Sequence, residues 1–111
     1  MTLREHQSLF AQDVARLIQY IYTLPDYSCS LGEAYRTKEQ AEIYAKQGKG
    51  IKNSLHCERL AIDINLFLDG YYLSHSKDYE RLGCFWESLD SKNRWGGKFK
   101  RADGNHFERN I

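Results

Sequence analysis

Several features that mark specialised classes of protein are scarce or missing in this 111-residue chain. No apolar run approaches the roughly 18 residues of a membrane-spanning helix, so membrane insertion is not expected. Sixteen basic and fifteen acidic residues leave a net charge of +1, which gives no sign of a nucleic-acid partner. The N-terminal stretch MTLREHQSLF has no basic region followed by an apolar core, so no secretory signal peptide is expected.

Cysteine is also scarce, with only Cys29, Cys57 and Cys84. These residues are widely spaced and form no C-x-x-C pair, which argues against a disulfide framework and against a zinc knuckle. We therefore expect reduced thiols that pack like small apolar residues.

What the chain does contain is enough apolar material for one core. Hydrophobic residues make up 41% of the sequence and aromatic residues 14%, which is typical of a compact fold and not of a disordered chain. The length predicts one domain, residues 1–111, that buries about two-thirds of its unfolded surface.

Capping signals predict three helices. Thr2 and Glu5 form a capping box before a helix with apolar residues at helical spacing up to about Thr23. A second box, Thr37 with Gln40, begins a shorter helix that ends near residue 48. A third helix is expected over residues 77–89, capped by Ser76.

Strand signals separate these helices. Residues 28–35 favour a short strand, and residues 60–66 alternate between apolar and other side chains with a period of two. The dipeptide Asp69-Gly70 predicts a hairpin, and a further short strand is expected over residues 105–109. The predicted fold is a small α+β domain with a largely antiparallel sheet packed by about three helices.

The alternating strand carries the first functional signal. Its core face is formed by Leu60, Ile62, Ile64 and Leu66, so Asp63 points to the opposite face, toward solvent or a cleft. Near the C-terminus, the stretch DGNHFE places His106 and Glu108 on one face of another strand. Together with His56, these residues supply two histidines and an aspartate at strand edges, which matches the three-ligand set of a catalytic zinc site.

Four blocks of sequence then resemble one known family. These are Ser54-x-His56 with Ala61-x-Asp63, the acid-x-x-His-aromatic-Glu element that ends at Glu108, the stretch AYRTKEQ and the stretch RWGGKF. In order and spacing they resemble the zinc D-Ala-D-Ala peptidase family, which includes VanX- and VanY-type enzymes and phage L-alanyl-D-glutamate endopeptidases. The resemblance runs from about residue 32 to residue 108.

The resemblance implies a role for each matching residue. It makes His56, Asp63 and His106 the ligands of a Zn²⁺ ion in a cleft at the sheet. It places Asp103 at the position of the catalytic acid and base, and Arg36 at that of the arginine that holds the substrate near the scissile carbonyl.

Two further positions are informative under the same resemblance. Ser54 matches a hydroxyl residue beside the metal. Arg59 departs from the family, which often has glycine there, so a long cation is expected to narrow or recharge the mouth of the cleft.

Each of these residues also has an ordinary structural interpretation. Asp103 precedes a glycine and is a common type of turn residue, and Arg36 suits an exposed ion pair. Glu108 either orients an imidazole or is a solvated charge, and Trp95 either lines the cleft or anchors the core. His6, like His75, has no matching partner and is expected at the surface.

The expected function is zinc-dependent hydrolysis of an amide bond in the stem peptide of peptidoglycan. The family analogy favours a phage or prophage endolysin that cuts the L-alanyl-D-glutamate bond, acts as a monomer and resides in the host cytoplasm before reaching the cell wall. The alternative enzyme is a D-alanyl-D-alanine carboxypeptidase or dipeptidase. A different class, a Hedgehog-like zinc-containing binding module, also stays open, but such a module needs neither Asp103 nor Arg36.

Overall fold

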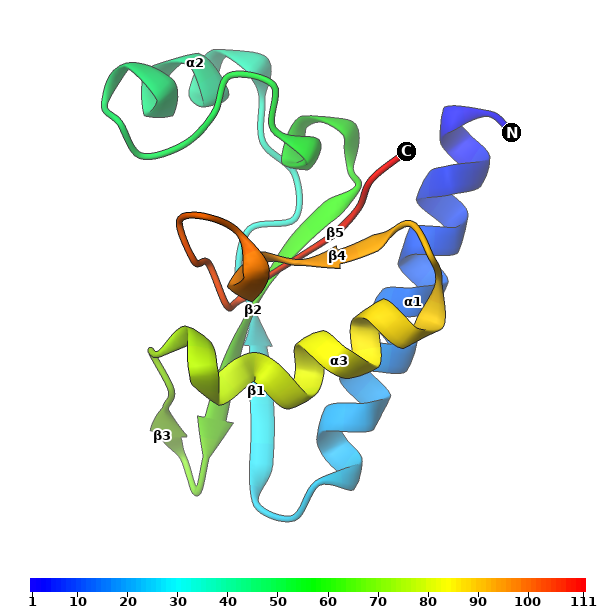
Figure 1. Cartoon of the computed structure of the whole chain (residues 1–111), viewed down its shortest axis with the longest axis vertical. Helices are drawn as coiled ribbons and strands as arrows, with labels where there is room; N and C mark the ends of the chain where they lie inside the picture. Colours follow the sequence, from blue (N-terminus) through cyan, green and yellow to red (C-terminus); the bar gives the residue numbers. More distant parts are fainter.

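The computed structural model describes all residues, 1–111, as three α-helices around a five-stranded antiparallel sheet (Figure 1). The helices are α1 (Leu3–Thr23), α2 (Lys38–Lys46) and α3 (Glu80–Leu89), and the strands are β1 (Tyr27–Leu31), β2 (Ala61–Leu68), β3 (Tyr71–Tyr72), β4 (Asn93–Trp95) and β5 (His106–Arg109). Short 3₁₀ turns lie at η1 (Leu55–Glu58), η2 (Ser76–Tyr79) and η3 (Gly96–Lys98). The predicted α+β fold class is confirmed.

The sheet has the strand order β1-β2-β5-β4, and β3 returns beside β2 as the hairpin partner. The predicted hairpin turn is present, because Asp69 and Gly70 have φ values of 51° and 81°. Such left-handed conformations at both central residues are typical of tight turns between antiparallel strands.

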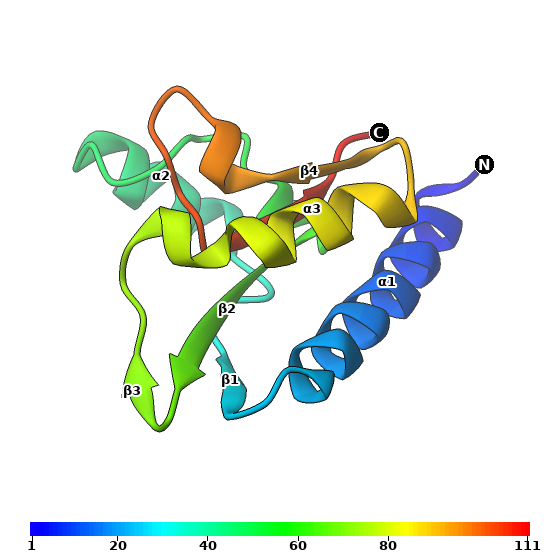
Figure 2. The same ribbon diagram turned by 60° about the horizontal axis from the view of Figure 1, so that its bottom comes forward.

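One face of the sheet carries the core. Helices α1 and α3 pack against each other and against the strands, as Figure 2 shows, whereas α2 lies apart from them. The predicted inward face of β2 is confirmed, since Ile62, Ile64 and Leu66 are buried and belong to one apolar cluster with Trp86 and Phe107. Asp63 therefore points to the face that α1 and α3 leave open.

The helix starts follow the sequence with one exception. The capping box of Thr2 and Glu5 is fully formed, and the Thr37 hydroxyl accepts the Gln40 N–H. The third helix is not capped by Ser76 as expected: residues 76–79 form a 3₁₀ turn, and the Ser76 hydroxyl accepts the Gly104 N–H at 2.9 Å. This serine therefore joins the start of the α3 region to the turn before β5.

Strand β4 was not predicted. Its three residues precede a pair of glycines and carry no alternation long enough to be recognised. No helix in the structure combines the length and the apolar character needed to span a membrane.

Candidate metal centre

His56 is presented by a 3₁₀ turn, not by a strand edge as the sequence suggested. The Ser54 hydroxyl caps this turn by accepting the His56 N–H at 3.1 Å, and both residues are buried. The segment before α2 also holds the turn, because the Arg36 N–H donates to the His56 carbonyl at 3.2 Å. Ser54 thus fixes the backbone from which the imidazole projects.

Asp63 and His106 face each other across the sheet. Strands β2 and β5 are antiparallel, and their register makes these two residues direct partners. Side chains of partnered residues point to the same face. The predicted common face of His106 and Glu108 is confirmed by a contact of 2.7 Å between His106 Nε2 and Glu108 Oε1.

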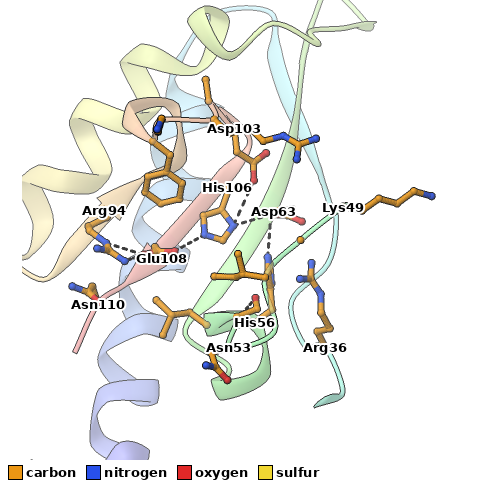
Figure 3. Close-up of a pocket in the computed structure, with 18 residues that line it drawn as sticks. Arg36, Lys49, Asn53, His56, Asp63, Arg94, Asp103, His106, Glu108 and Asn110 are labelled. Atoms are coloured by element: carbon orange, nitrogen blue, oxygen red, sulfur yellow. Dashed lines mark hydrogen bonds and ion pairs between the residues drawn. The ribbon is translucent and has the colours of Figure 1, made fainter. Parts of the chain in front are cut away.

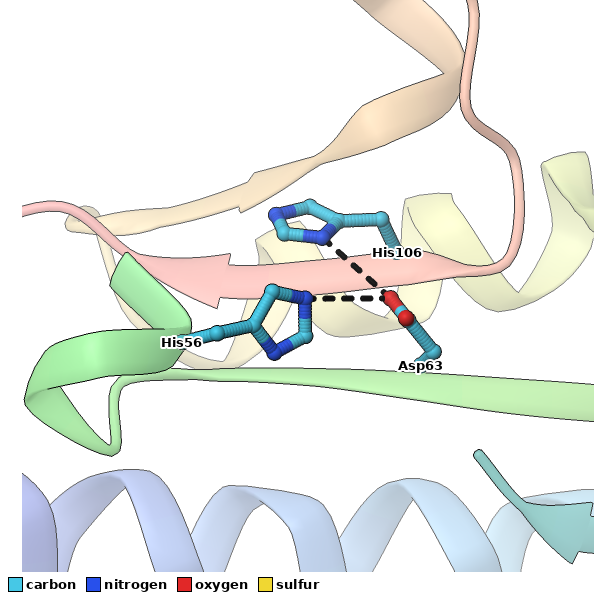
Figure 4. A group of neighbouring side chains, drawn as sticks. All are labelled: His56, Asp63 and His106. Carbon is cyan, nitrogen blue, oxygen red and sulfur yellow. Dashed lines mark ion pairs between the residues drawn. The ribbon is translucent and has the colours of Figure 1, made fainter. Parts of the chain in front are cut away.

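The three side chains bring one donor atom each to a single point (Figure 4). Asp63 Oδ1 lies 3.3 Å from His56 Nε2 and 3.3 Å from His106 Nδ1, and all three candidate ligand atoms lie within 4.8 Å of one another. Asp63 Oδ1 is buried and has no hydrogen-bond partner. Three donor atoms that converge in this way could hold a metal ion, and two imidazoles with one carboxylate are ligands that suit Zn²⁺.

Each imidazole is backed by a carboxylate that an arginine holds in turn. Behind His106, the carboxylate of Glu108 is 7% exposed and accepts from the Arg94 guanidinium at 2.8 Å. Because His106 Nε2 contacts this carboxylate at 2.7 Å, Nδ1 is the nitrogen left to face Asp63.

The corresponding arm behind His56 is looser. Glu33 Oε1 lies 3.7 Å from His56 Nδ1, and its side chain is 27% exposed. The same oxygen accepts from Arg36 Nε at 2.8 Å. The Glu33 carbonyl also accepts the Asp63 N–H at 2.9 Å, so the backbone of this residue is tied to the candidate ligand strand.

Sequence reasoning did not identify Glu33. It lies three residues before Arg36 in a stretch without regular structure, and only the strand register brings it beside His56. A single acidic residue in an irregular stretch is too common in protein sequences to predict a contact with a metal ligand.

In the metal-free protein, contacts within the cluster stabilise the charged forms of Asp63 and His106. Burial opposes ionisation of Asp63, but the contacts with His106 and His56 outweigh it and lower the pKa of Asp63 to about 2. Burial likewise disfavours the cationic form of His106, yet Asp63 and Glu108 outweigh it and raise the pKa of His106 to about 9. A proton on His106 therefore supplies the positive charge that a metal ion would otherwise provide.

The cluster opens into a cleft of about 850 Å³ on the uncovered side of the sheet (Figure 3). Arg36, Ser54, Asp103 and Glu108 line the cleft together with the three candidate ligands. Asp103 Oδ2 lies 4.0 Å from His106 Nδ1, and its side chain is 57% exposed. Partial burial raises the pKa of the Asp103 carboxyl, and His106 opposes that rise.

Trp95 does not line the cleft. It is 5% exposed, belongs to the apolar core and donates from Nε1 to the Gly104 carbonyl at 2.7 Å. The following Gly96 lies against the turn that carries the site, since a Cβ there would meet the Asp103 carbonyl oxygen at 2.2 Å. Of the two interpretations, the core anchor describes this tryptophan, which supports the Asp103–His106 turn from below.

Arg59 also lies outside the cleft, so the expectation that it narrows or recharges the mouth is wrong. It ends the 3₁₀ turn with φ at 56°, a conformation that favours glycine. Its guanidinium lies over the Tyr35 ring, 4.0 Å from the centroid. A glycine would adopt this backbone conformation without strain.

Comparisons with known proteins find one matching family and one similar fold. The model of a family described as D-alanyl-D-alanine carboxypeptidase matches residues 47–109, which include all three candidate ligands. No curated protein matches the chain. Among solved structures, the L-Ala D-Glu endopeptidase ChiX of Serratia marcescens has a similar fold, with a TM-score of 0.74 and 18% identity over 90% of this chain and 77% of that chain.

The family match covers more than half of the chain and spans the 3₁₀ turn, β2 and β5 that build the candidate centre. The solved structure supports the same fold over nearly the full length. The chain therefore belongs to the D-alanyl-D-alanine carboxypeptidase family of peptidases.

Proposed function

We propose that this protein is a zinc-dependent peptidase that cuts an amide bond in the stem peptide of peptidoglycan, with the L-alanyl-D-glutamate bond as its target. The observation that carries the proposal is the convergence of His56, Asp63 and His106 beside a partly exposed carboxylate, Asp103, in a chain of this family. Three protein ligands leave a zinc ion one position for water or substrate, as in hydrolytic sites.

The residues that would hold the ion are His56 through Nε2, His106 through Nδ1 and Asp63 through Oδ1. A zinc ion held there would act as a Lewis acid and would make water a stronger nucleophile at neutral pH. Glu108 orients the His106 imidazole from its far nitrogen, whereas Glu33 lies 3.7 Å from His56 Nδ1 and makes no hydrogen bond to it.

Asp103 is the group that we assign to proton transfer. Its carboxylate takes a proton from the attacking water and returns it to the nitrogen of the leaving amine. Its side chain is 57% exposed in the cleft and lies 4.0 Å from the candidate ligand His106, so it can reach a water or a substrate beside the ligands.

Arg36 is assigned to the carbonyl oxygen of the scissile amide. Its side chain is 13% exposed, and Glu33 fixes its orientation in the cleft wall. A guanidinium held in this way stabilises the negative charge that develops on the oxygen during attack.

The choice of bond rests on the similar fold of the L-Ala D-Glu endopeptidase ChiX. The family description instead favours a D-alanyl-D-alanine carboxypeptidase as the second candidate. A phage or prophage origin, and action as a monomer from the host cytoplasm, remain part of the proposal.

Digestion of purified peptidoglycan tests the proposal and separates the two bonds. Cutting of L-Ala-D-Glu creates a new amino group on D-glutamate, whereas the alternative releases free D-alanine; mass analysis of the fragments identifies each. Absence of both products with the zinc-loaded protein, at protein concentrations that bind the peptide, would overturn the peptidase assignment.

A further inference from the structure

Beyond the metal centre, the uncovered face of the sheet continues along β2. Side chains at every second position of a strand share one face, so Asn65 and Phe67 lie on the same face as Asp63. Along the strand, Asn65 is roughly 7 Å and Phe67 roughly 13 Å from Asp63. In Figure 1, β2 runs from its pairing with β5, at the metal centre, to its hairpin with β3.

The neighbouring strands widen this surface. Paired residues point their side chains to the same face, so the register adds two residues of β1 and one of β3. We call this surface the β2 outer face, and it consists of Ser28, Ser30, Asn65, Phe67 and Tyr72. Two contacts agree with this arrangement. Asn65 donates from Nδ2 to Ser30 Oγ at 3.4 Å, and the Phe67 and Tyr72 rings lie 5.7 Å apart between centroids.

The two aromatic rings of the β2 outer face take no part in the core. Phe67 is half-buried and Tyr72 is 54% exposed, and neither belongs to the apolar cluster or to the side chains packed against it. No residue of this face carries a charge. Accessible rings beside hydroxyl groups and an amide fit a ligand that is uncharged, has flat apolar faces and carries many hydrogen-bonding groups.

We propose that the β2 outer face binds the sugar strand of peptidoglycan. This inference rests on the proposed function and deepens it, since the sugar strand is the polymer that carries the stem peptide. The C–H bonds of a pyranose ring form an apolar face that stacks on Phe67 and Tyr72, as apolar groups do on aromatic rings. The hydroxyl and acetamido groups of the sugar are partners for Asn65 and the two serines.

The position of the β2 outer face also favours one of the two candidate bonds. In peptidoglycan a lactyl group joins the sugar to the L-alanine of the stem peptide, so only that alanine separates the lactyl group from the L-alanyl-D-glutamate bond. One extended residue spans about 3.5 Å, so a peptide cut at this bond beside Asp63 brings its sugar over Asn65 and Phe67. The D-alanyl-D-alanine bond lies three residues further along, which adds roughly 10 Å and carries the sugar past the end of the face.

Binding of a sugar without any stem peptide tests the β2 outer face independently of hydrolysis. The probe is chitotetraose, the β-1,4-linked tetramer of N-acetylglucosamine, titrated into the zinc-loaded protein and followed by NMR of the backbone amides. We expect the amide signals of β1, β3 and the far half of β2 to shift. Phe67→Ala and Tyr72→Ala should each raise the dissociation constant about tenfold, because each removes one stacking ring.

Tyr71→Ala is the matched control. Tyr71 is the neighbouring tyrosine and is 77% exposed, but it is paired with Leu68 and so points to the opposite face. This variant should bind chitotetraose like the wild type. Absence of shifts in the wild type, unchanged binding in both test variants, or an equal loss in Tyr71→Ala would overturn the proposal.

A second copy of the chain is the other occupant that the experiment can detect. Sedimentation at the protein concentration used for NMR measures self-association in the wild type and in Tyr72→Ala. A monomer in both agrees with the proposal. A wild-type dimer that Tyr72→Ala dissociates and that chitotetraose leaves intact would assign the face to the second copy and overturn the sugar site.

Hydrolysis separates failure of the sugar site from failure of the enzyme assignment. The two substrates are a stem tripeptide that carries its disaccharide and the same tripeptide with an acetyl group in place of the sugar. We expect kcat/KM to be about tenfold higher for the first, and Tyr72→Ala should reduce this ratio to less than about threefold. Equal cutting of both substrates without chitotetraose binding would remove the sugar site and leave the peptidase. Chitotetraose binding that is lost in Tyr72→Ala, with no cutting of either substrate, would keep the sugar site and remove the peptidase.

Discussion

Two regions of this protein bury a histidine among carboxylates, and they balance their charges in different ways. In the candidate metal centre, His56, His106 and Asp63 face one another with no cationic side chain between them. In the second region, which we call the Arg109 cluster (His6, Asp13, Asp90, Asn93 and Arg109), a guanidinium lies at the middle. It donates from Nε to His6 Nδ1 at 3.1 Å and pairs through Nη1 with Asp90 at 2.8 Å.

The Arg109 cluster joins the N-terminal helix to the end of the sheet. Arg109 is only 2% exposed, and Asn93 donates to Asp13 of α1 at 3.1 Å. Because the chain supplies its own cation here, there is no place for an ion from solution. The metal centre lacks that cation and has a proton on His106 in its place, which a metal ion can displace. The comparison suggests that a missing internal cation, more than the presence of histidine, distinguishes a binding site from a structural cluster.

The largest effect should come from removing a ligand in the metal centre. Zinc at a thousand times its dissociation constant should stabilise the wild type by about 4 kcal/mol. Asp63→Asn keeps the size of the side chain but removes the charged ligand, so zinc should no longer raise the melting temperature. Thermal unfolding with and without zinc, together with metal analysis, measures this.

The control is Asp78→Asn, an exposed aspartate outside the cleft, which should respond to zinc like the wild type. If zinc stabilises Asp63→Asn as strongly as the wild type, the metal binds elsewhere and the contrast between the two regions is lost.

Removal of the Arg109 guanidinium should lower the stability of the protein but leave its zinc binding unchanged. Arg109→Met leaves His6 and Asp90 without their shared partner, and loss of one member of a buried pair costs about 3 kcal/mol. We expect the melting temperature to fall by roughly 10–20 °C, while zinc content stays at the wild-type value. The exposed Arg81→Met on α3 serves as the control and should change stability little. Loss of zinc together with stability would mean that the two regions are coupled.

The carboxylates of the two regions also differ, and a substitution of Asp103 tests that difference. The Arg109 cluster engages its carboxylates in ion pairs or hydrogen bonds, whereas Asp103 extends into the cleft with a side chain that is 57% exposed. Asp103→Asn keeps the turn but cannot accept a proton, so turnover should fall by at least about 100-fold with zinc content unchanged. Steady-state hydrolysis of stem peptides measures this. Activity within a few-fold of the wild type would leave Asp103 as a turn residue.

Within the metal centre, the two glutamates should differ in importance. Glu108 contacts His106 at 2.7 Å, but Glu33 lies 3.7 Å from His56. Glu108→Gln should therefore weaken zinc binding about tenfold, and Glu33→Gln by less than about threefold. Competition with a chelating dye measures both affinities, with the exposed Glu39→Gln on α2 as control. Equal losses would show that the tight and the loose arm support their imidazoles alike.

Local patterns predicted much of the fold because they depend on neighbouring residues. The alternation in β2 identified its core face, and the capping box at Thr2 marked the start of α1. The sequence could not give the contact of Asp63 with His106 from its pattern, since that contact depends on the β2–β5 register; the family resemblance supplied it. Glu33 was not predicted for the same reason, because its place beside His56 also depends on strand register.

The Arg109 cluster shows where sequence reasoning failed. His6 was expected at the surface because no partner was visible, but it is buried against Arg109, 103 positions away in the chain. A buried arginine cannot be recognised from composition, because arginine is ordinarily an exposed residue. Only the packing of α1 against the end of β5 creates its surroundings.

The smallest effect concerns pH and the histidine of the Arg109 cluster. Burial lowers the pKa of His6, and the nearby cations Arg109 and Lys92 lower it further, against a weaker pull from Glu5. A histidine whose folded pKa is depressed is neutral in the native state, so its contribution to stability is complete above the unfolded pKa of about 6.5 and is lost as pH falls below it.

In His6→Asn the amide oxygen still accepts from Arg109 but does not titrate. Melting curves of both metal-free proteins between pH 7.5 and pH 5 should therefore diverge, with the wild type losing more stability on the acid side; the difference isolates His6, because the other groups titrate alike in both. Parallel curves would mean that Arg109 tolerates a protonated His6 and that the cluster is less tightly balanced than its geometry indicates.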